Sequence, residues 1–290
     1  MKPVLKWAGG KARLADRIAD VFGGACEGTY YEPFLGSAAV FLRLKEAGLI
    51  GRAVLSDVNA KLVAVHRSLR DDVESVLEEL ARLPGDDWRD RYYEIRERFN
   101  EGPHEGPAHA ARLLWLNRTG YNGLYRENRK GRYNVPRGQY RSVSLPKPDH
   151  FRKVSRLLAD TELLSLPFAE VIDRARTGDH VYCDPPYVPL DATSRFTDYC
   201  SLPFGHAEQM ALADSSWRAA ARGAHVVLSN HDLPIVRDEI YPEDLGFQHV
   251  VGFGVRRAIS CARRRSVREL IAEIRPHSRV SPPPRAAVVA

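Results

Sequence analysis

Cysteine is scarce in this chain of 290 residues, and the spacing of the few cysteines argues against two kinds of site. No two of them form a C-x-x-C pair; they are Cys26, Cys183, Cys200 and Cys261. Such spacing supports neither a zinc site nor a disulfide framework. We therefore expect four reduced thiols in a cytoplasmic protein that holds no metal.

Long apolar runs are also missing. No stretch approaches the roughly 18 apolar residues of a membrane helix. The N-terminal sequence MKPVLKWAGGKARL lacks the apolar run of a signal peptide. We expect no membrane association. A chain of this length that is 44% hydrophobic and 28% charged can still build a core that needs no disulfides.

Positive charge is concentrated in one segment. The net charge of the chain is +6, from 43 Lys and Arg against 37 Asp and Glu. Residues 112–156 contain 12 basic side chains opposed only by Glu127 and Asp149, so this segment carries +10 and the remainder −4. A polyanionic partner accounts for such a segment. The alternative is an ordinary solvated basic face.

Short β-prone runs alternate with helical patterns at both ends of the chain. The expected strands are residues 29–33, 53–56, 180–183, 225–228, 248–253 and 268–274. The expected helices are residues 37–47, a segment that follows Asp57, and residues 204–222. Strands that alternate with helices in this way predict a parallel α/β sheet.

The middle of the chain has a different character. Residues 71–99 show helical spacing, and after a loop at 101–107 a second helix ends near Asn117. In the following stretch, TGYNGLYRENRKGRYNVPRGQY, the residues NRKG lie between two β-prone runs and predict a hairpin turn. We expect a discontinuous α/β domain, residues 1–62 and 161–275, with an insert at 63–160. The Pro-rich residues 276–290 predict a disordered tail.

The strongest local motif is Asp184-Pro185-Pro186-Tyr187, directly after an expected strand. Parallel sheets build their sites at the carboxyl ends of strands. The two prolines remove backbone donors and fix φ, so that nearby carbonyls are held as acceptors. A carboxylate beside such a carbonyl suits an amino group, and the tyrosine offers a face for a planar ring. A rigid turn without function is the alternative.

A second motif, EPFLGSAA at residues 32–39, lies between an expected strand and a helix. Its small residues allow a ligand to approach the backbone at a helix N-terminus. It is not the dinucleotide pattern G-x-G-x-x-G, because position 38 is Ala38. Asp57 follows the next strand, where an acidic residue either binds a ribose hydroxyl or caps the following helix.

Two other features are set aside. The sequence KWAGGK at residues 6–11 lacks the G-x-x-x-x-G-K-[ST] pattern and follows no strand, which excludes a phosphate loop. His231, within SNHD, has no G-x-S-x-G elbow to complete a triad, so we expect a hydrogen-bonded histidine at a strand end.

The chain resembles the Dam family of DNA adenine-N6 methyltransferases in the order of its motifs, which are KWAGGK, EPFLGSAAVFL, LSDVNAKL, NRTGYNGLYRENRKGRYNVP, VYCDPPY and SNHD. The resemblance extends over residues 4–274. It implies an α/β fold: a Rossmann-like, S-adenosylmethionine-dependent methyltransferase sheet with an inserted helical and β-hairpin DNA-recognition domain. Ala38 stands where the family's second motif usually has glycine, and Arg137 replaces a residue that is often aromatic.

The resemblance also implies roles for individual residues. The catalytic residues would be Asp184, Pro185, Pro186 and Tyr187. The S-adenosylmethionine-binding residues would be Trp7, Lys11, Glu32, Phe34, Gly36, Ser37, Ala38, Asp57 and Asp184. The DNA-binding residues would be Lys6, Arg118, Tyr121, Asn122, Leu124, Arg126, Asn134, Pro136 and Tyr140.

The implied reaction is methyl transfer to N6 of adenine in duplex DNA after the base is flipped out. Because Leu124, Arg126 and Pro136 match the Dam pattern, we expect GATC as the site. The alternatives are an amino-methyltransferase that acts on RNA or another DNA site, and a DNA-binding module without activity. We expect a monomer, and a restriction enzyme that acts on the same site would be its natural counterpart in the cell.

Overall fold

The computed structural model covers residues 1–290 and describes all of them except 8, 12–13, 191–203, 256–266 and 277–290. Nearly all of the predicted disordered tail therefore lies outside the described residues, as do Cys200 and Cys261. Cys26 and Cys183 are buried free thiols. In the part of the chain that the structure describes, no group of three metal-binding side chains occurs and no helix has the length and apolar character of a membrane span.

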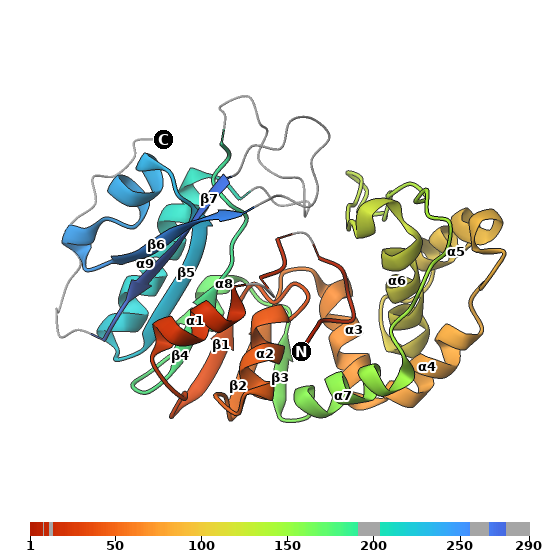
Figure 1. Cartoon of the computed structure of the whole chain (residues 1–290), viewed down its shortest axis with the longest axis horizontal. Coiled ribbons are helices and arrows are strands. Elements are labelled where there is room, and N and C mark those ends of the chain that lie inside the picture. Colours follow the sequence, from red (N-terminus) through yellow and green to blue (C-terminus); the bar gives the residue numbers. More distant parts are fainter. Residues whose placement is uncertain (8, 12–13, 191–203, 256–266, 277–290) are drawn as a thin grey trace.

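A single seven-stranded sheet runs through the described residues (Figure 1). Its strands are β1 (Thr29–Glu32), β2 (Arg52–Ser56), β3 (Thr161–Leu164), β4 (His180–Cys183), β5 (His225–His231), β6 (Gln248–Val255) and β7 (Val267–Ile274). They lie in the order β3-β2-β1-β4-β5-β7-β6, in which β1 to β5 are parallel and β7 is antiparallel to both neighbours. The six predicted strands are confirmed, and β3 is one that the sequence pattern did not indicate.

Helices cover both faces of this sheet. On one face lie α1 (Ala15–Phe22), α2 (Ala39–Glu46) and α3 (Ala60–Asp71); on the other lie α8 (Phe168–Ile172), α9 (His206–Ala221) and the short turns η2 (Val236–Ile240) and η3 (Glu243–Leu245). Successive strand residues alternate between the two cores: Tyr30 and Tyr182 pack in one, Tyr31 and Val181 in the other. This period of two is what burial on both faces requires.

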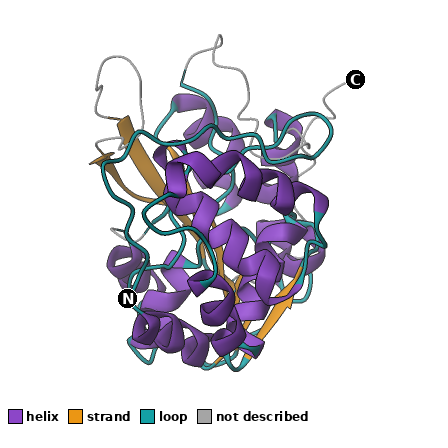
Figure 2. Cartoon of the chain, turned by 90° about the vertical axis from the view of Figure 1, so that its right-hand side faces the viewer, coloured by secondary structure: helices purple, strands orange, loops and turns teal. Residues whose placement is uncertain are grey.

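The segment between β2 and β3 is mainly helical and extends to one side of the sheet (Figures 1 and 2). It contains α4 (Val73–Ala81), α5 (Trp88–Glu101), α6 (Gly106–Thr119), η1 (Tyr121–Gly123) and α7 (Pro148–Leu158). The helical pattern at 71–99 is split, because Pro84 and Gly85 interrupt it. Side chains of α4, α5 and α6 share one hydrophobic cluster with α3 and the sheet, so the insert packs directly on the α/β core.

The predicted hairpin is present as a turn with isolated bridges. Glu127 and Tyr133 form an antiparallel bridge, and the amide of Gly131 donates to the carbonyl of Asn128 over 2.9 Å. The Asn128 carboxamide oxygen also accepts from the amide of Lys130. Backbone bonds continue the ladder from Asn128 to Arg132 and from Asn134 to Arg126, and the side chain of Asn100 accepts from the amide of Tyr133 over 2.7 Å. The hairpin is thus anchored to α5.

Burial of His109 generates a prediction about acid stability. Its ring is 1% exposed, stacks 5.0 Å from Phe99 and donates to the carbonyl of Lys61, and burial lowers its pKa to about 4. Between about pH 4 and 6.5 the unfolded chain therefore binds more protons than the folded protein. We expect this histidine to reduce the free energy of unfolding as the pH falls through that window, by up to ~1.4 kcal/mol per pH unit.

Urea denaturation of wild type and His109→Gln between about pH 4.5 and 6.5 checks this prediction. The variant should lose this component of the pH dependence. Phe99→Leu, which disturbs the same packing but keeps the imidazole, should retain it. Parallel curves for wild type and His109→Gln would contradict the prediction.

Candidate active site and DNA-reading surface

The strand order reverses between β1 and β4, and the candidate site lies at their carboxyl ends. The register pairs Tyr31 with Val181, so Glu32 and Cys183 end neighbouring strands. The turn after β1 and the loop after β4 therefore start side by side. Asp57 follows β2 on the other side of β1. This position is where parallel α/β sheets bind ligands.

The turn after β1 is held closed around Gly36. Its amide donates to the Asp57 carboxylate over 3.0 Å, and its carbonyl accepts from the ring of His66 over 2.9 Å. Gly36 has a φ of +48°, and a Cβ there would lie 2.9 Å from the indole of Trp7. Only glycine satisfies both constraints. The turn therefore holds Trp7 and Asp57 beside each other.

Ala38 ends this turn with a φ of +60°. The left-handed region costs a residue with a Cβ roughly 1–2 kcal/mol. The position where the chain departs from the family pattern is thus one where the backbone favours glycine. Ala38 and its neighbour Ser37 are both buried, and the amide of Ala38 donates to Leu35 to begin α2.

Asp57 does not cap the helix that follows it, so the capping alternative is wrong. The cap of α3 is Asn59, whose side chain accepts from the amide of Leu62. The Asp57 carboxylate instead accepts from the amides of Gly36 and Asn59. Burial raises its pKa, and these two N–H donors oppose the rise. Each carboxylate oxygen keeps a further lone pair for a ligand.

An aromatic cluster lies beside the turn. Phe34, Phe168 and Phe204 come from the segments after β1, after β3 and before α9, with ring centroids 5.6–5.9 Å apart. All three side chains are half-buried. Phe168, which begins α8, and Phe204, which precedes α9, are residues that the sequence did not single out, since isolated phenylalanines at the ends of elements carry no periodic signal.

Glu32, predicted to bind the cofactor, is 2% exposed and has internal partners. Its carboxyl accepts from the hydroxyl of Tyr30 over 2.7 Å and from the amide of Phe41 over 3.1 Å. It thereby ties the end of β1 to the first turn of α2. Burial raises its pKa to about 8.

The loop after β4 carries the predicted catalytic residues. The Oδ1 atom of Asp184 lies 3.1 Å from the ammonium of Lys11, which also donates to the carbonyl of Gly9 and lies 4.5 Å from the ring centroid of Tyr187. Burial raises the pKa of Asp184, and the Lys11 ammonium is the main influence that opposes this rise. The pairing of Lys11 with Asp184 joins residues too distant in sequence for any local pattern to indicate.

The remaining loop residues are held from the β5 side. The edge of the His231 ring meets the ring of Tyr187 with centroids 4.9 Å apart, and the Tyr187 hydroxyl donates to Glu269 on β7 over 3.4 Å. The Pro186 carbonyl accepts from the side chain of Gln209 over 2.7 Å. His231 is hydrogen-bonded at the end of its strand, as predicted.

The predicted DNA-binding residues surround the hairpin and η1. Exposed side chains are those of Lys6, Tyr121, Asn122, Arg126 and Pro136; half-buried ones are those of Arg118, Leu124, Asn134 and Tyr140. The guanidinium of Arg126 donates from Nε to the side chain of Asn134 over 2.7 Å, so Asn134 fixes its direction. The ammonium of Lys6 lies 5.3 Å from the ring centroid of Tyr140. Arg118 instead donates to the carbonyl of Val4 and holds the N-terminal segment.

Asn117 joins this surface to the other site, and sequence reasoning did not identify it. Its side chain, 2% exposed, accepts from the amide of Lys6 and donates to the carbonyls of Lys6 and Gly123, at 2.7, 2.7 and 2.9 Å. Trp7, which follows Lys6, packs against Tyr125 of the insert with ring centroids 5.4 Å apart and planes tilted by 30°. The segment that carries Lys11 is therefore fixed to η1. A polar residue inside a helix gives no sign in the sequence of such partners.

Comparisons with known proteins identify the family. Residues 7–250 match the family described as D12 class N6 adenine-specific DNA methyltransferase. This chain belongs to that family. The DNA adenine methylase of Escherichia coli (strain K12) is 35% identical over 280 residues, which cover 94% of this chain and 95% of the relative. The type II methyltransferase M.MjaIII of Methanocaldococcus jannaschii is 34% identical over 243 residues, covering 79% and 84%.

This D12-class methyltransferase is thus an adenine-specific DNA methyltransferase, and the Dam-family resemblance read from the motifs is confirmed. Its seven-stranded α/β sheet agrees with the predicted methyltransferase fold.

The positive segment of this methyltransferase is only partly a free surface. Two basic residues of α7 are paired with acids: Arg152 with Glu74 and Lys153 with Glu46. Arg132 pairs with Glu97 on α5. Acidic residues outside residues 112–156 therefore neutralise part of the +10. Arg129 and Lys130 at the hairpin turn are exposed.

Burial of Glu32 in the methyltransferase predicts a pH dependence opposite in sign to that of His109. A carboxyl with a pKa of about 8 when folded and about 4.5 when unfolded holds more protons in the folded state across that window. The free energy of unfolding should therefore fall as the pH rises through it, by up to ~1.4 kcal/mol per pH unit.

Glu32→Gln keeps the neutral form of the side chain at every pH, so denaturation curves should lose this slope. The matched variant Tyr30→Phe removes the hydrogen bond but keeps the carboxyl, and it should keep the slope. An unchanged pH dependence in Glu32→Gln would show that the carboxyl is not held neutral.

Proposed function

We propose that this methyltransferase transfers a methyl group from S-adenosylmethionine to N6 of adenine in duplex DNA, at GATC sites, with the target base flipped out of the helix. The observation that carries the proposal is the placement of the Asp184 carboxylate and the Tyr187 ring at the carboxyl end of β4, next to the Gly36–Asp57 turn. The acceptor for an amine follows β4 and the acceptor for a nucleoside follows β2, the two strands that flank β1.

The residues around the turn suit S-adenosylmethionine in chemistry. Asp57 has lone pairs for ribose hydroxyls, and the Phe34 cluster supplies apolar surface for a purine. Oδ1 of Asp184 is a buried oxygen with no hydrogen bond in the described part of the chain besides its ion pair with Lys11, and a cationic ligand suits it. Trp7 would complete the wall over Gly36. When bound, S-adenosylmethionine supplies a methyl group that its sulfonium centre already activates.

The work of the protein is to make adenine N6 a better nucleophile. The lone pair of N6 is delocalised into the purine, and acceptors on both N–H groups draw it back toward nitrogen. Asp184 supplies one acceptor, and Lys11 favours its ionised form. The resemblance to the Dam family implies that the carbonyl of Pro185 is the second acceptor, while the carbonyl of Pro186 accepts from Gln209. Alignment and electrostatic stabilisation of charge on N6 are then the main catalytic terms.

The hairpin would read the DNA. Arg126, aimed by Asn134, is suited to O6 and N7 of a guanine. Tyr121, 38% exposed on η1, would fill the gap that the flipped adenine leaves. The agreement of Leu124, Arg126 and Pro136 with the Dam pattern supports GATC as the sequence.

The central prediction concerns DNA from a host without adenine methylation. Expression of the wild type should protect GATC sites against a restriction enzyme that cuts only the unmethylated sequence, and Asp184→Ala should lower the rate by at least ~100-fold because the charged acceptor is lost. Asp160→Ala, at an exposed aspartate before β3, is the matched control and should retain activity.

Single-molecule mapping of N6-methyladenine in the same DNA identifies the modified sequence. Methylation at another sequence would overturn GATC and keep the reaction. Activity that survives in Asp184→Ala would overturn the mechanism. DNA binding without methylation by the wild type would favour a DNA-binding module without activity.

The hairpin turn generates a prediction about salt. Each phosphate contact contributes about 0.9 to the slope of log K against log salt concentration. Replacing Arg129 and Lys130 by Gln should therefore lower that slope by up to about 2, measured by anisotropy with a GATC duplex. The control, Arg152→Gln with Lys153→Gln, removes the same charge from α7, where both residues are paired with acids, and should change the slope little. An equal change of the salt slope in the two double variants would show that the hairpin turn contributes no more to DNA binding than α7 does.

A further inference from the structure

The loop that carries the proposed acceptors is held by side chains that lie outside the motif. Gln209 is on α9, and Asn230 and His231 end β5. Their exposed fractions are 1%, 1% and 6%. Buried amides are costly unless their hydrogen bonds are made. We therefore expect each of these three buried side chains to have hydrogen-bond partners that explain its burial.

The carboxamides of Asn230 and Gln209 link three hydrogen bonds into an amide chain, which begins and ends on the loop after β4. The amide of Val188 donates to Oδ1 of Asn230 over 3.1 Å. Nδ2 of Asn230 donates to Oε1 of Gln209 over 3.1 Å, and Nε2 of Gln209 donates to the carbonyl of Pro186 over 2.7 Å. The chain has one direction, because each carboxamide uses its oxygen on one side and its nitrogen on the other. It spans the peptide units on both sides of Tyr187.

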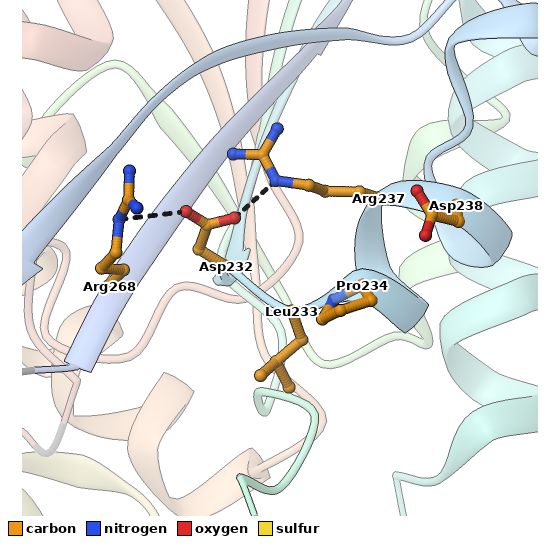
Figure 3. A pocket seen from close by; sticks show the side chains of 6 residues that line it. All are labelled: Asp232, Leu233, Pro234, Arg237, Asp238 and Arg268. Carbon is orange, nitrogen blue, oxygen red and sulfur yellow. Dashed lines mark hydrogen bonds and ion pairs between the residues drawn. The ribbon is translucent and has the colours of Figure 1, made fainter.

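His231 and Asp232 support the same region from β5. Nδ1 of His231 donates to the carbonyl of Val188 over 2.6 Å. The next residue, Asp232, lies between the guanidinium groups of Arg237 and Arg268, at 2.5 and 3.4 Å (Figure 3). The end of β5 is therefore fixed by ion pairs. The hollow that these residues line has its arginines already paired with a carboxylate, so we assign it no ligand.

We infer that Gln209 and Asn230 are positioning residues, which set the Pro185–Tyr187 backbone against the reacting amine through the Pro186 carbonyl and the Val188 amide. This inference rests on the proposed function, and neither residue belongs to the proposed catalytic set. Prolines at 185 and 186 have no N–H with which to anchor the loop. The amide chain supplies the missing constraint.

Gln209→Met tests the inference, because it keeps the length of the side chain and removes both hydrogen bonds. The single-turnover rate should fall by ~30-fold or more, since displacement by about 1 Å can cost ~100-fold. The dissociation constants for DNA and S-adenosylmethionine should stay within about threefold of wild type, which separates alignment from binding. Ser216→Ala is the matched control: it removes a buried hydrogen bond of 2.8 Å on the same helix without touching the loop. It should keep the wild-type rate.

Two further variants test which end of each carboxamide donates and which accepts. Gln209→Glu can still accept from Asn230 but cannot donate to Pro186, and Asn230→Asp can still accept from Val188 but cannot donate to Gln209. Each puts an anionic acceptor where the carboxamide nitrogen donates, so neither should recover the activity that Gln209→Met and Asn230→Leu lose. The double variant Gln209→Met with Asn230→Leu should show less than the product of the single effects, as residues of one network do. If Gln209→Met does not fold by its urea curve, Gln209→Glu takes its place.

Hydrogen exchange provides a readout that does not need activity. Amides in a peptide that covers residues 184–190 should exchange at least ~10-fold faster in Gln209→Met and at the wild-type rate in Ser216→Ala. If the wild type methylates no DNA, the proposed function fails, and the exchange data still decide whether Gln209 holds the loop after β4. If the wild type is active, equal rates and equal exchange in Gln209→Met and Ser216→Ala overturn the inference.

Discussion

The parallel pairing of β1 with β4 is the constraint on which the site depends. The chain leaves β1 toward β2, passes through the insert to β3 on the same side, and then returns through α8 to β4 on the other side, so the connections diverge at this pair of strands. Their carboxyl ends are the one place where a turn from each half can face a common ligand. The register sets Glu32 beside the strand that delivers Asp184, and a slip by one residue would turn both side chains to the opposite face.

The N-terminal segment transmits this placement to the insert. Within six residues it supplies Lys6 to the hairpin side, Trp7 to the Gly36 turn and Lys11 to Asp184. Asn117 pairs with both backbone groups of Lys6, as a neighbouring strand would, and binds η1 with its remaining N–H. The surface proposed to read bases and the loop proposed to hold the target amine are thus tied to one stretch of backbone. A displacement of either surface can therefore move the other through residues 6–11, without a change in the sheet.

The sequence predicted those parts of the structure that local patterns determine. Six of the strands follow from β-prone runs between turns. The alternation of helices and strands indicates the parallel pairing of β1, β2, β4 and β5, but it did not predict that β7 is antiparallel to β5 and β6. The motif after β4 predicts its own position because Asp184 directly follows a strand. The pattern failed where tertiary partners decide: β3 exists because β2 offers a buried edge, and the capping of α3 goes to Asn59 because Asp57 is engaged by Gly36. The charge of residues 112–156 likewise takes its meaning from Glu46, Glu74 and Glu97, which the segment itself does not contain.

The amides around the loop after β4 show why such partners escape sequence reasoning and why the site needs them. A motif with two consecutive prolines gains rigid φ angles and loses the donors that would anchor it to neighbouring backbone. Whatever holds it must bring a donor for a carbonyl and an acceptor for the next available amide. A carboxamide is the neutral side chain that offers both, and neutrality matters beside Asp184, because a cation there would compete for the carboxylate and an anion would raise its pKa. Gln209 and Asn230 meet these requirements at positions 21 residues apart, on elements that join only in the folded sheet.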